Sequence, residues 1–154
     1  MSRAFVKESD GADGEELPEL QVSPHRNLVT PSGLQRIEAT VGLLQVALSR
    51  ARADADRAQI ARIQRDLRYW SERQHTAEVI PAAESADVVR FGCAVTLEKP
   101  DGVTVEYRIV GEDEADPARG SISYVSPIAR FLIGRVQGDV VALPDGEATI
   151  LEIS

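Results

Sequence analysis

Two carboxylates separated by a single residue, Asp54 and Asp56, stand between two long segments of periodic apolar residues. A pair of carboxylates on a rigid arm can hold a hard cation such as Mg²⁺ through oxygen ligands. Asp56 is also followed three positions later by Gln59, which is the spacing of a capping box at a helix N-terminus. The spacing favours capping over metal binding, and Asp54 is the alternative cap.

A second group of acids forms the segment Gly111-Glu112-Asp113-Glu114-Ala115-Asp116-Pro117. Four acids in a short loop usually indicate a solvated turn. The more specific hypothesis is that this segment forms a docking surface for a basic partner. The segment Ser126-Pro127-Ile128-Ala129-Arg130 follows, and a hydroxyl residue before a proline predicts the start of a short helix.

The other reactive groups are few. His25 and His75 are isolated, so we expect no metal site, and the single cysteine, Cys93, excludes an internal disulfide. Cys93 is expected to be a buried structural thiol. There is no Gly-rich phosphate loop, no H-E-x-x-H and no G-x-S-x-G. The sequence therefore predicts no catalytic residue, no cofactor and no enzyme.

Length and charge narrow the possible classes of protein. The chain has 154 residues, 43% of them hydrophobic, and a formal net charge of -8. This composition predicts a folded domain with an appendage, and the negative charge argues against sequence-independent binding of duplex DNA. No apolar run reaches the roughly 20 residues of a membrane span and no signal peptide is visible, so we expect a cytoplasmic protein without membrane contact.

The middle of the chain predicts two helices. Thr30-Pro31 is typical of a helix start. Two coiled-coil seams follow, with spacings of three and four residues. The first seam is Leu34, Ile37, Val41, Leu44, Leu48, Ala51 and Ala55; the second is Ile60, Ile63, Leu67, Trp70, Gln74 and Ala77. The seams are out of phase, which favours a turn near 53–57 and an antiparallel hairpin ending at Pro81. One long helix that dimerises is the competing interpretation.

Arginines mark this segment: Arg50, Arg52, Arg57, Arg62, Arg65, Arg68 and Arg73. A solvated helix face is the favoured interpretation. The organisation we predict is a disordered acidic leader (1–27), a helical hairpin (28–80), a linker (81–87) and an α+β domain (88–154). Alternating apolar residues predict strands within 88–97, 103–109, 122–124, 140–143 and 149–153, with one short helix over 126–132.

At the acidic loop the sequence resembles the C-terminal domain of the GreA/GreB transcription elongation factors. The resemblance rests on four segments. They are Phe91-Gly92-Cys93-Ala94-Val95-Thr96-Leu97, Tyr107-Arg108-Ile109-Val110-Gly111-Glu112-Asp113-Glu114-Ala115-Asp116, Ser126-Pro127-Ile128-Ala129-Arg130, and Leu132-Ile133-Gly134 together with Gly138-Asp139. Thr30-Pro31-Ser32-Gly33-Leu34 and Ala77-Glu78-Val79-Ile80 are similar to the opening and close of the family's hairpin.

The resemblance implies a small FKBP-like antiparallel β-sheet domain that docks on bacterial RNA polymerase at its secondary channel. The hairpin would then enter the channel as a short coiled coil. The candidate docking residues implied by the motif are Gly111, Glu112, Asp113, Glu114, Ala115, Asp116, Ser126, Pro127 and Ile128. A monomer is expected, with nascent RNA or DNA reached only through the polymerase complex and any Mg²⁺ belonging to the polymerase.

The hairpin departs from the family pattern. The family's tip motif is missing, and the hairpin is shorter by roughly eighteen residues, which shortens each arm by about 13 Å at 1.5 Å per residue. At most the protein would stimulate RNA hydrolysis by the polymerase. The open alternatives are a transcript cleavage factor using Asp54 and Asp56, an adaptor like the short-hairpin regulators of nucleoside diphosphate kinase, and a peptidyl-prolyl isomerase.

Overall fold

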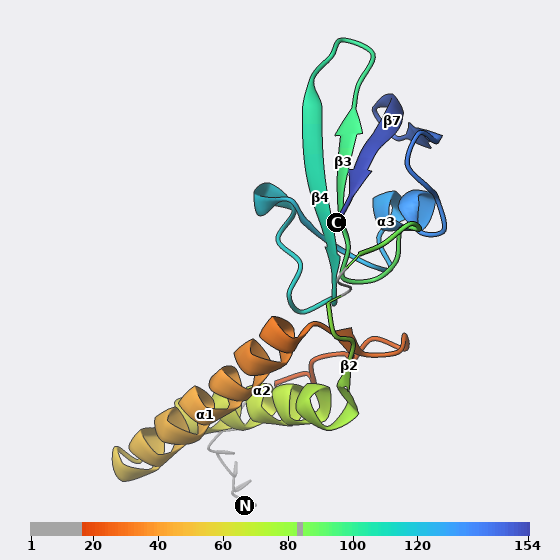
Figure 1. The fold of residues 1–154 in the computed structure, drawn as a ribbon. Coiled ribbons are helices and arrows are strands. Elements are labelled where there is room, and N and C mark those ends of the chain that lie inside the picture. The colour runs from red at the N-terminus through yellow and green to blue at the C-terminus, as the bar shows by residue number, and fades with distance from the viewer. Residues whose placement is uncertain (1–16, 83–84) are drawn as a thin grey trace, which may run out of the picture.

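The protein consists of a two-helix hairpin and a small β-sheet domain with one short helix (Figure 1). The computed structural model describes residues 17–82 and 85–154. In chain order the elements are β1 (Leu28–Val29), α1 (Pro31–Ala53), α2 (Arg57–Thr76), β2 (Glu78–Val79), β3 (Ala94–Glu98), β4 (Thr104–Val110), the 3₁₀ helix η1 (Pro117–Arg119), β5 (Ser121–Ser123), α3 (Pro127–Leu132), β6 (Val140–Leu143) and β7 (Gly146–Ile153).

Both long helices begin at the residues that the sequence indicates. The Thr30 hydroxyl accepts a hydrogen bond from the Gly33 amide at 2.9 Å, and Pro31 occupies the first turn. Asp56 Oδ1 accepts from the Gln59 amide at 3.0 Å. Each cap satisfies an amide that has no partner within its helix. The capping interpretation of Asp56 is therefore confirmed.

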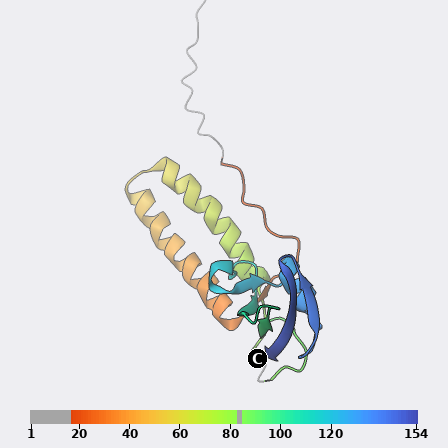
Figure 2. The same ribbon diagram turned by 90° about the horizontal axis from the view of Figure 1, so that it is seen from above.

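The helices are antiparallel and joined by a tight turn at residues 54–56 (Figure 2). Ala55 has a φ of 54°, the only non-glycine residue with positive φ in the described ranges. Leu48, Ala51 and Ile63 are buried between the helices, with Leu44, Ala47, Ile60 and Leu67 packed around them. The predicted hairpin is confirmed, and the alternative of one long helix is wrong.

The base of the hairpin differs from the prediction. The second helix ends at Thr76, and β1 and β2 then pair in parallel, with Leu28 opposite Glu78. Near this end the predicted seam position Gln74 is exposed, and Arg73 is buried instead. The sequence pattern misses this change because it counts only apolar spacing, whereas Arg73 is buried against charged partners.

The predicted acidic leader is only partly described. Residues 1–16 lie outside the described residues, so disorder there stays a prediction. Residues 17–27 have no regular secondary structure, and Asn27 at the end of this segment is buried. The Asn27 side-chain amide donates to the Arg73 carbonyl at 2.7 Å. This hydrogen bond ties the chain before β1 to the end of α2.

The C-terminal domain is a five-stranded sheet in the order β5-β4-β3-β7-β6. Pairing is antiparallel except at β4 and β5, which run parallel because the chain crosses over through η1. The predicted α+β fold class is confirmed, with this one parallel edge as a departure from an antiparallel sheet. The acidic segment 111–116 follows directly from the end of β4.

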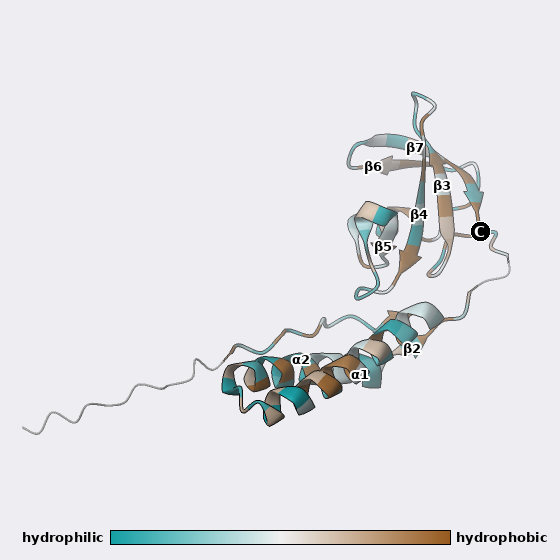
Figure 3. Cartoon of the chain, turned by 90° about the vertical axis from the view of Figure 1, so that its left-hand side faces the viewer, coloured by the Kyte–Doolittle hydropathy of each residue, from teal (hydrophilic) through white to brown (hydrophobic). Residues whose placement is uncertain are grey.

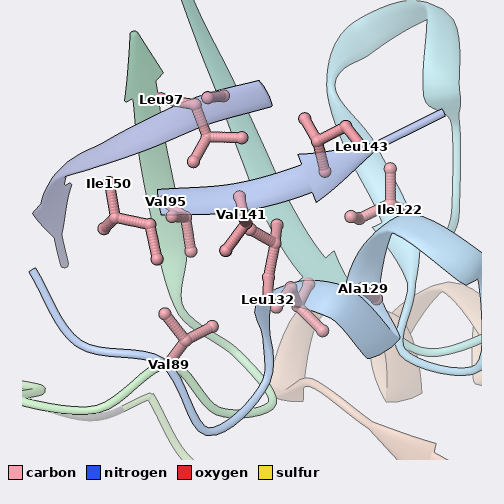
Figure 4. Close-up of a cluster of buried hydrophobic side chains, with 11 residues drawn as sticks. Val89, Val95, Leu97, Ile122, Ala129, Leu132, Val141, Leu143 and Ile150 are labelled. Carbon is pink, nitrogen blue, oxygen red and sulfur yellow. The ribbon is translucent and has the colours of Figure 1, made fainter. Parts of the chain in front are cut away.

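One face of this sheet curls around α3 and forms the main hydrophobic core (Figure 4). Val95 and Leu97 of β3, Ile150 of β7 and Leu132 of α3 are all buried in this cluster. Cys93 is a free cysteine that is 1% exposed, so the predicted buried thiol is confirmed. No helix among the described residues is long and apolar enough to span a membrane.

Candidate functional site: the hairpin tip and the interdomain junction

The tip of the hairpin carries Asp54 and Asp56 at the turn between α1 and α2, as the sequence predicts. Asp54 is exposed and closes α1, whereas the Asp56 carboxylate is engaged by the first turn of α2. Within residues 17–82 and 85–154, no group of three or more His, Cys, Asp or Glu residues could hold a metal ion.

A shallow hollow near the tip of the hairpin is lined by a mixture of apolar and charged side chains. Leu43 is 72% exposed and Val46 is 53% exposed on α1. They line this hollow together with Arg50, Gln59 and both tip acids, Asp54 and Asp56. The end of the hairpin thus presents exposed apolar side chains beside its charges.

The acidic loop after β4 lies against the base of the hairpin. The Arg73 Nε donates to Asp113 Oδ2 at 2.5 Å, and the Tyr69 hydroxyl donates to Asp113 Oδ1 at 2.6 Å. The Arg73 and Asp113 side chains are only 2% and 11% exposed. A charge removed from water to this extent requires a close partner. Asp113 supplies it from the other domain, with both of its oxygens occupied.

Burial also changes the proton affinity of Tyr69. Burial and the hydrogen bond to the Asp113 carboxylate raise the pKa of Tyr69 to about 12, because both disfavour the phenolate. Burial, followed by the nearby Glu112, raises the pKa of Tyr124 in the same direction. Both phenols stay protonated at neutral pH, so Tyr69 remains a hydrogen-bond donor to Asp113.

Glu114 binds the start of the hairpin. Its carboxylate accepts from the Thr30 hydroxyl, with distances of 2.7 and 2.6 Å to its two oxygens. Thr30 in turn caps α1. The carboxylate thus stands at the N-terminus of a 23-residue helix, where the helix dipole favours negative charge. A side chain at Gly33 would meet it, since a Cβ there would lie 2.6 Å from Glu114 Oε2.

The two other residues of this segment complete the contact. Glu112 Oε2 lies 3.8 Å from the Arg73 guanidinium and is a buried oxygen without a hydrogen bond within the described residues. Gly111 is buried, and a Cβ on it would lie 2.5 Å from the Leu28 carbonyl oxygen. We call Thr30, Tyr69, Arg73, Glu112, Asp113 and Glu114 the interdomain junction.

The remaining predicted docking residues lie outside this junction. Ala115 is half-buried, and Asp116 faces Arg119 at 3.5 Å. The Ser126 hydroxyl accepts from the Ala129 amide at 3.3 Å and caps α3. Pro127 is exposed and Ile128 is half-buried on the same helix. Docking by these residues stays a prediction, while the side chains of Glu112, Asp113 and Glu114 are turned toward the hairpin.

Sequence reasoning missed Tyr69 and the role of Arg73. It treated Arg73 as one of seven arginines on a solvated face, although this residue directly precedes the seam position Gln74. An arginine so close to a buried seam needs a carboxylate partner. This need is the feature of the sequence that could have indicated the contact. The partner is 40 residues away in the sequence, which is beyond the range of local patterns.

Comparison with known sequences identifies both parts of the chain. The family described as "Transcription elongation factor, GreA/GreB, C-term" matches residues 84–154. GreB of Xanthomonas axonopodis pv. citri is 38% identical over 149 residues, covering 82% of this chain and 89% of that protein. GreA of Desulfovibrio desulfuricans is 40% identical over 100 residues, covering 62% of each chain. GreA of an Anaeromyxobacter species is 54% identical over 76 residues, covering 47% of this chain and 46% of that protein.

Two matches to solved structures have low TM-scores. The GreA/GreB factor from Nitrosomonas europaea matches with a TM-score of 0.41 and 20% identity, covering 84% of this chain and 98% of that chain. The Gfh1 protein of Thermus thermophilus matches with a TM-score of 0.40 and 19% identity, and the match covers 84% of this chain and 99% of that chain. The chain spans less than two thirds of two of the three GreA and GreB relatives named above, but almost all of the Xanthomonas protein. On the strength of that last match, the chain belongs to the GreA/GreB family of transcription elongation factors.

Proposed function

We propose that this protein regulates transcription elongation by binding bacterial RNA polymerase. Its C-terminal domain docks at the secondary channel, and its hairpin extends into that channel. The observation that carries the proposal is the interdomain junction, in which Arg73 and Asp113 hold a family-type C-terminal domain to the hairpin. The hairpin projects away from that domain (Figure 3). A probe fixed in this way keeps one direction relative to the docking domain.

The protein acts by occupying the channel rather than by supplying catalytic ligands. The Asp56 side chain caps α2, whereas Asp54 ends α1 through its backbone amide, which leaves its carboxylate uncommitted to a cap. The arms have 23 and 20 residues, about 35 and 30 Å at 1.5 Å per residue. Metal ligation depends on distances within tenths of an ångström. A shortened arm with one uncommitted carboxylate therefore supports regulation without transcript cleavage.

We assign docking to the exposed part of the predicted surface. Pro127 on α3 is exposed, and Phe131 of the same helix is 46% exposed. Asp116 is about half exposed and can pair with a basic group of the polymerase. Glu112, Asp113 and Glu114 contribute indirectly, because they orient the hairpin instead of facing a partner.

Binding of the labelled full chain to core RNA polymerase tests the proposal. We expect a saturable complex that GreA displaces, because both proteins would use the same site. Asp116→Lys should weaken the complex, while the matched control Glu147→Lys, an exposed acid on β7, should leave it unchanged. Failure of the unmodified chain to bind contradicts the proposed function. Equal weakening by both variants contradicts the assignment of the docking surface.

A further inference from the structure

The first helix of the hairpin is apolar on both of its sides along its middle part. No charged residue occurs in residues 39–49 of α1, whereas α2 carries charges along its whole length. A helix that is apolar all round is normally buried on all sides. The main contacts of α1 are with α2 and, at the base of the hairpin, with β1. Figure 2 shows α1 at the edge of the molecule, with α2 along one side of it.

The uncovered side of α1 has the repeat of a helix–helix contact. Six residues, which we call the outer seam, are separated alternately by three and four positions, as in a coiled coil: Arg36, Ala39, Leu43, Val46, Arg50 and Ala53. Leu48, which is buried against α2, lies on the opposite side of the helix. Leu43 is more exposed than any other large apolar residue that the structure describes. The outer seam is therefore suited to a second helix.

The two ends of the outer seam carry opposite charges. Arg36 stands at its N-terminal end, and Asp54 follows its C-terminal end. Neither side chain forms an ion pair within the described residues. Their separation of 18 positions corresponds to about five full turns, so both lie on the same side of the helix. Leu43 and Val46 stand almost midway between them, which makes the seam complementary to a reversed copy of itself.

We propose that two copies of this protein associate through the outer seam of α1, with the two helices antiparallel about a two-fold axis near residues 44–45. Leu43 of one copy then packs against Val46 of the other. The Arg36 side chain of one copy reaches the hollow at the hairpin tip of the other, where Asp54 and Asp56 are part of the lining. Each contact occurs twice, because a two-fold interface uses the same surface of both copies.

The association is transient. One helix from each copy forms the interface, so its area falls below the roughly 1,200 Å² of stable complexes. Two chains with a net charge of -8 also repel each other. The dimer therefore forms at high protein concentration, and the monomer that the sequence predicts persists at low concentration. The dimer is a property of the chain alone and does not rest on the proposed function.

Sedimentation equilibrium of the full chain tests the proposal, at concentrations from about 10 μM to about 1 mM. We expect the weight-average mass to rise from 16.7 kDa toward twice that value. Leu43→Gln with Val46→Gln should raise the dissociation constant by about tenfold or more, because four apolar side chains leave the interface. Val103→Gln with Val140→Gln is the matched control, since both residues are exposed and lie outside the hairpin. A constant mass of 16.7 kDa, or equal weakening by the two double variants, overturns the proposal.

Exchange of the end charges tests the antiparallel arrangement. Arg36→Glu and Asp54→Arg should each weaken the dimer severalfold, because like charges then face each other at both ends. The two substitutions together should restore the association, since every end contact again joins opposite charges. Arg62→Glu changes an exposed arginine of α2 and is the matched control, which should leave the dimer unchanged.

Two results of these experiments contradict the proposed arrangement. Failure of the exchanged protein to regain the association of the wild type overturns the antiparallel pairing. A chain that stays monomeric but loses binding to RNA polymerase in Leu43→Gln with Val46→Gln would show that the polymerase, and not a second copy, covers the outer seam. Circular dichroism confirms that each variant remains folded, which is expected because the substituted side chains are exposed in the single chain.

Discussion

Arg73 on α2 and Asp113 after β4 form the buried ion pair that joins the hairpin to the C-terminal domain. The two side chains are 2.5 Å apart at their closest atoms, and Tyr69 and Glu112 stand beside them. Three consecutive acids of the loop therefore face the hairpin, with Glu114 bound to Thr30. The loop that resembles a docking surface in sequence fixes the direction of the hairpin in the structure.

Removal of the Arg73 charge should destabilise the fold strongly. In Arg73→Met the Asp113 and Glu112 carboxylates lose their buried cation, and breaking a buried pair in this way costs about 3–5 kcal/mol. Urea unfolding followed by circular dichroism measures the change. The additional substitution Asp113→Leu should restore part of the loss, since it removes one stranded charge. The control Arg68→Met affects an exposed pair and should change stability little. A similar loss in both single variants would contradict the role of Arg73.

Stability should fall at high pH because of Tyr69. The pKa of this phenol is raised from 10.0 to about 12 in the folded protein. Below pH 10 the group is protonated in both the folded and unfolded chains, so its contribution is fully present. Between pH 10 and 12 only the unfolded chain loses the proton, so the contribution is lost as pH rises. Urea midpoints across this range should decline more steeply for the wild type than for Tyr69→Phe. Parallel declines would rule out a linked Tyr69.

The sequence predicts the separate parts of this structure better than their connection. The out-of-phase seams and the Asp56 cap predict the hairpin because helix periodicity and capping are local. The alternation of Val103, Val105, Tyr107 and Ile109 predicts β4 for the same reason. The parallel pair of β1 and β2 and the Arg73–Asp113 contact join residues about 40 to 50 positions apart. Neither has a local periodicity, so only the folded chain reveals them.

Any side chain in place of Gly111 should destabilise the fold. In Gly111→Ala the new Cβ would lie 2.5 Å from the Leu28 carbonyl oxygen, and backbone cannot move aside as a side chain can. Overpacking of this kind costs about 1–3 kcal/mol. Gly42 is the matched control, because nothing lies within 4 Å of its Cβ position in α1. Gly42→Ala should stabilise the helix by about 0.5–1 kcal/mol. Thermal unfolding of both variants checks this, and equal effects would disprove the close approach.

Asp56 should act through its cap and not through its charge. Asp56→Ala removes the acceptor for the Gln59 amide and should cost about 0.5–2 kcal/mol. Asp56→Asn keeps a capping oxygen, so its stability should stay close to that of the wild type. Asp54→Ala alters an exposed residue and should have little effect. Denaturation curves of these three variants separate the contribution of Asp56 to stability from that of Asp54. A loss of stability in Asp56→Asn as large as that in Asp56→Ala would show that the carboxylate charge is required.

Competition for backtracked transcription complexes tests the central claim most directly. Stalled complexes of bacterial RNA polymerase are incubated with GreA and with increasing amounts of this protein, and the release of short RNA is measured. If the hairpin occupies the same channel, GreA-dependent release of RNA should fall as the protein is added. Because the hairpin tip has no second free carboxylate, the protein alone should release no RNA. GreA-dependent release that stays undiminished at saturating protein would contradict the account. RNA release by the protein alone, if Asp54→Ala abolishes it, would contradict the account as well.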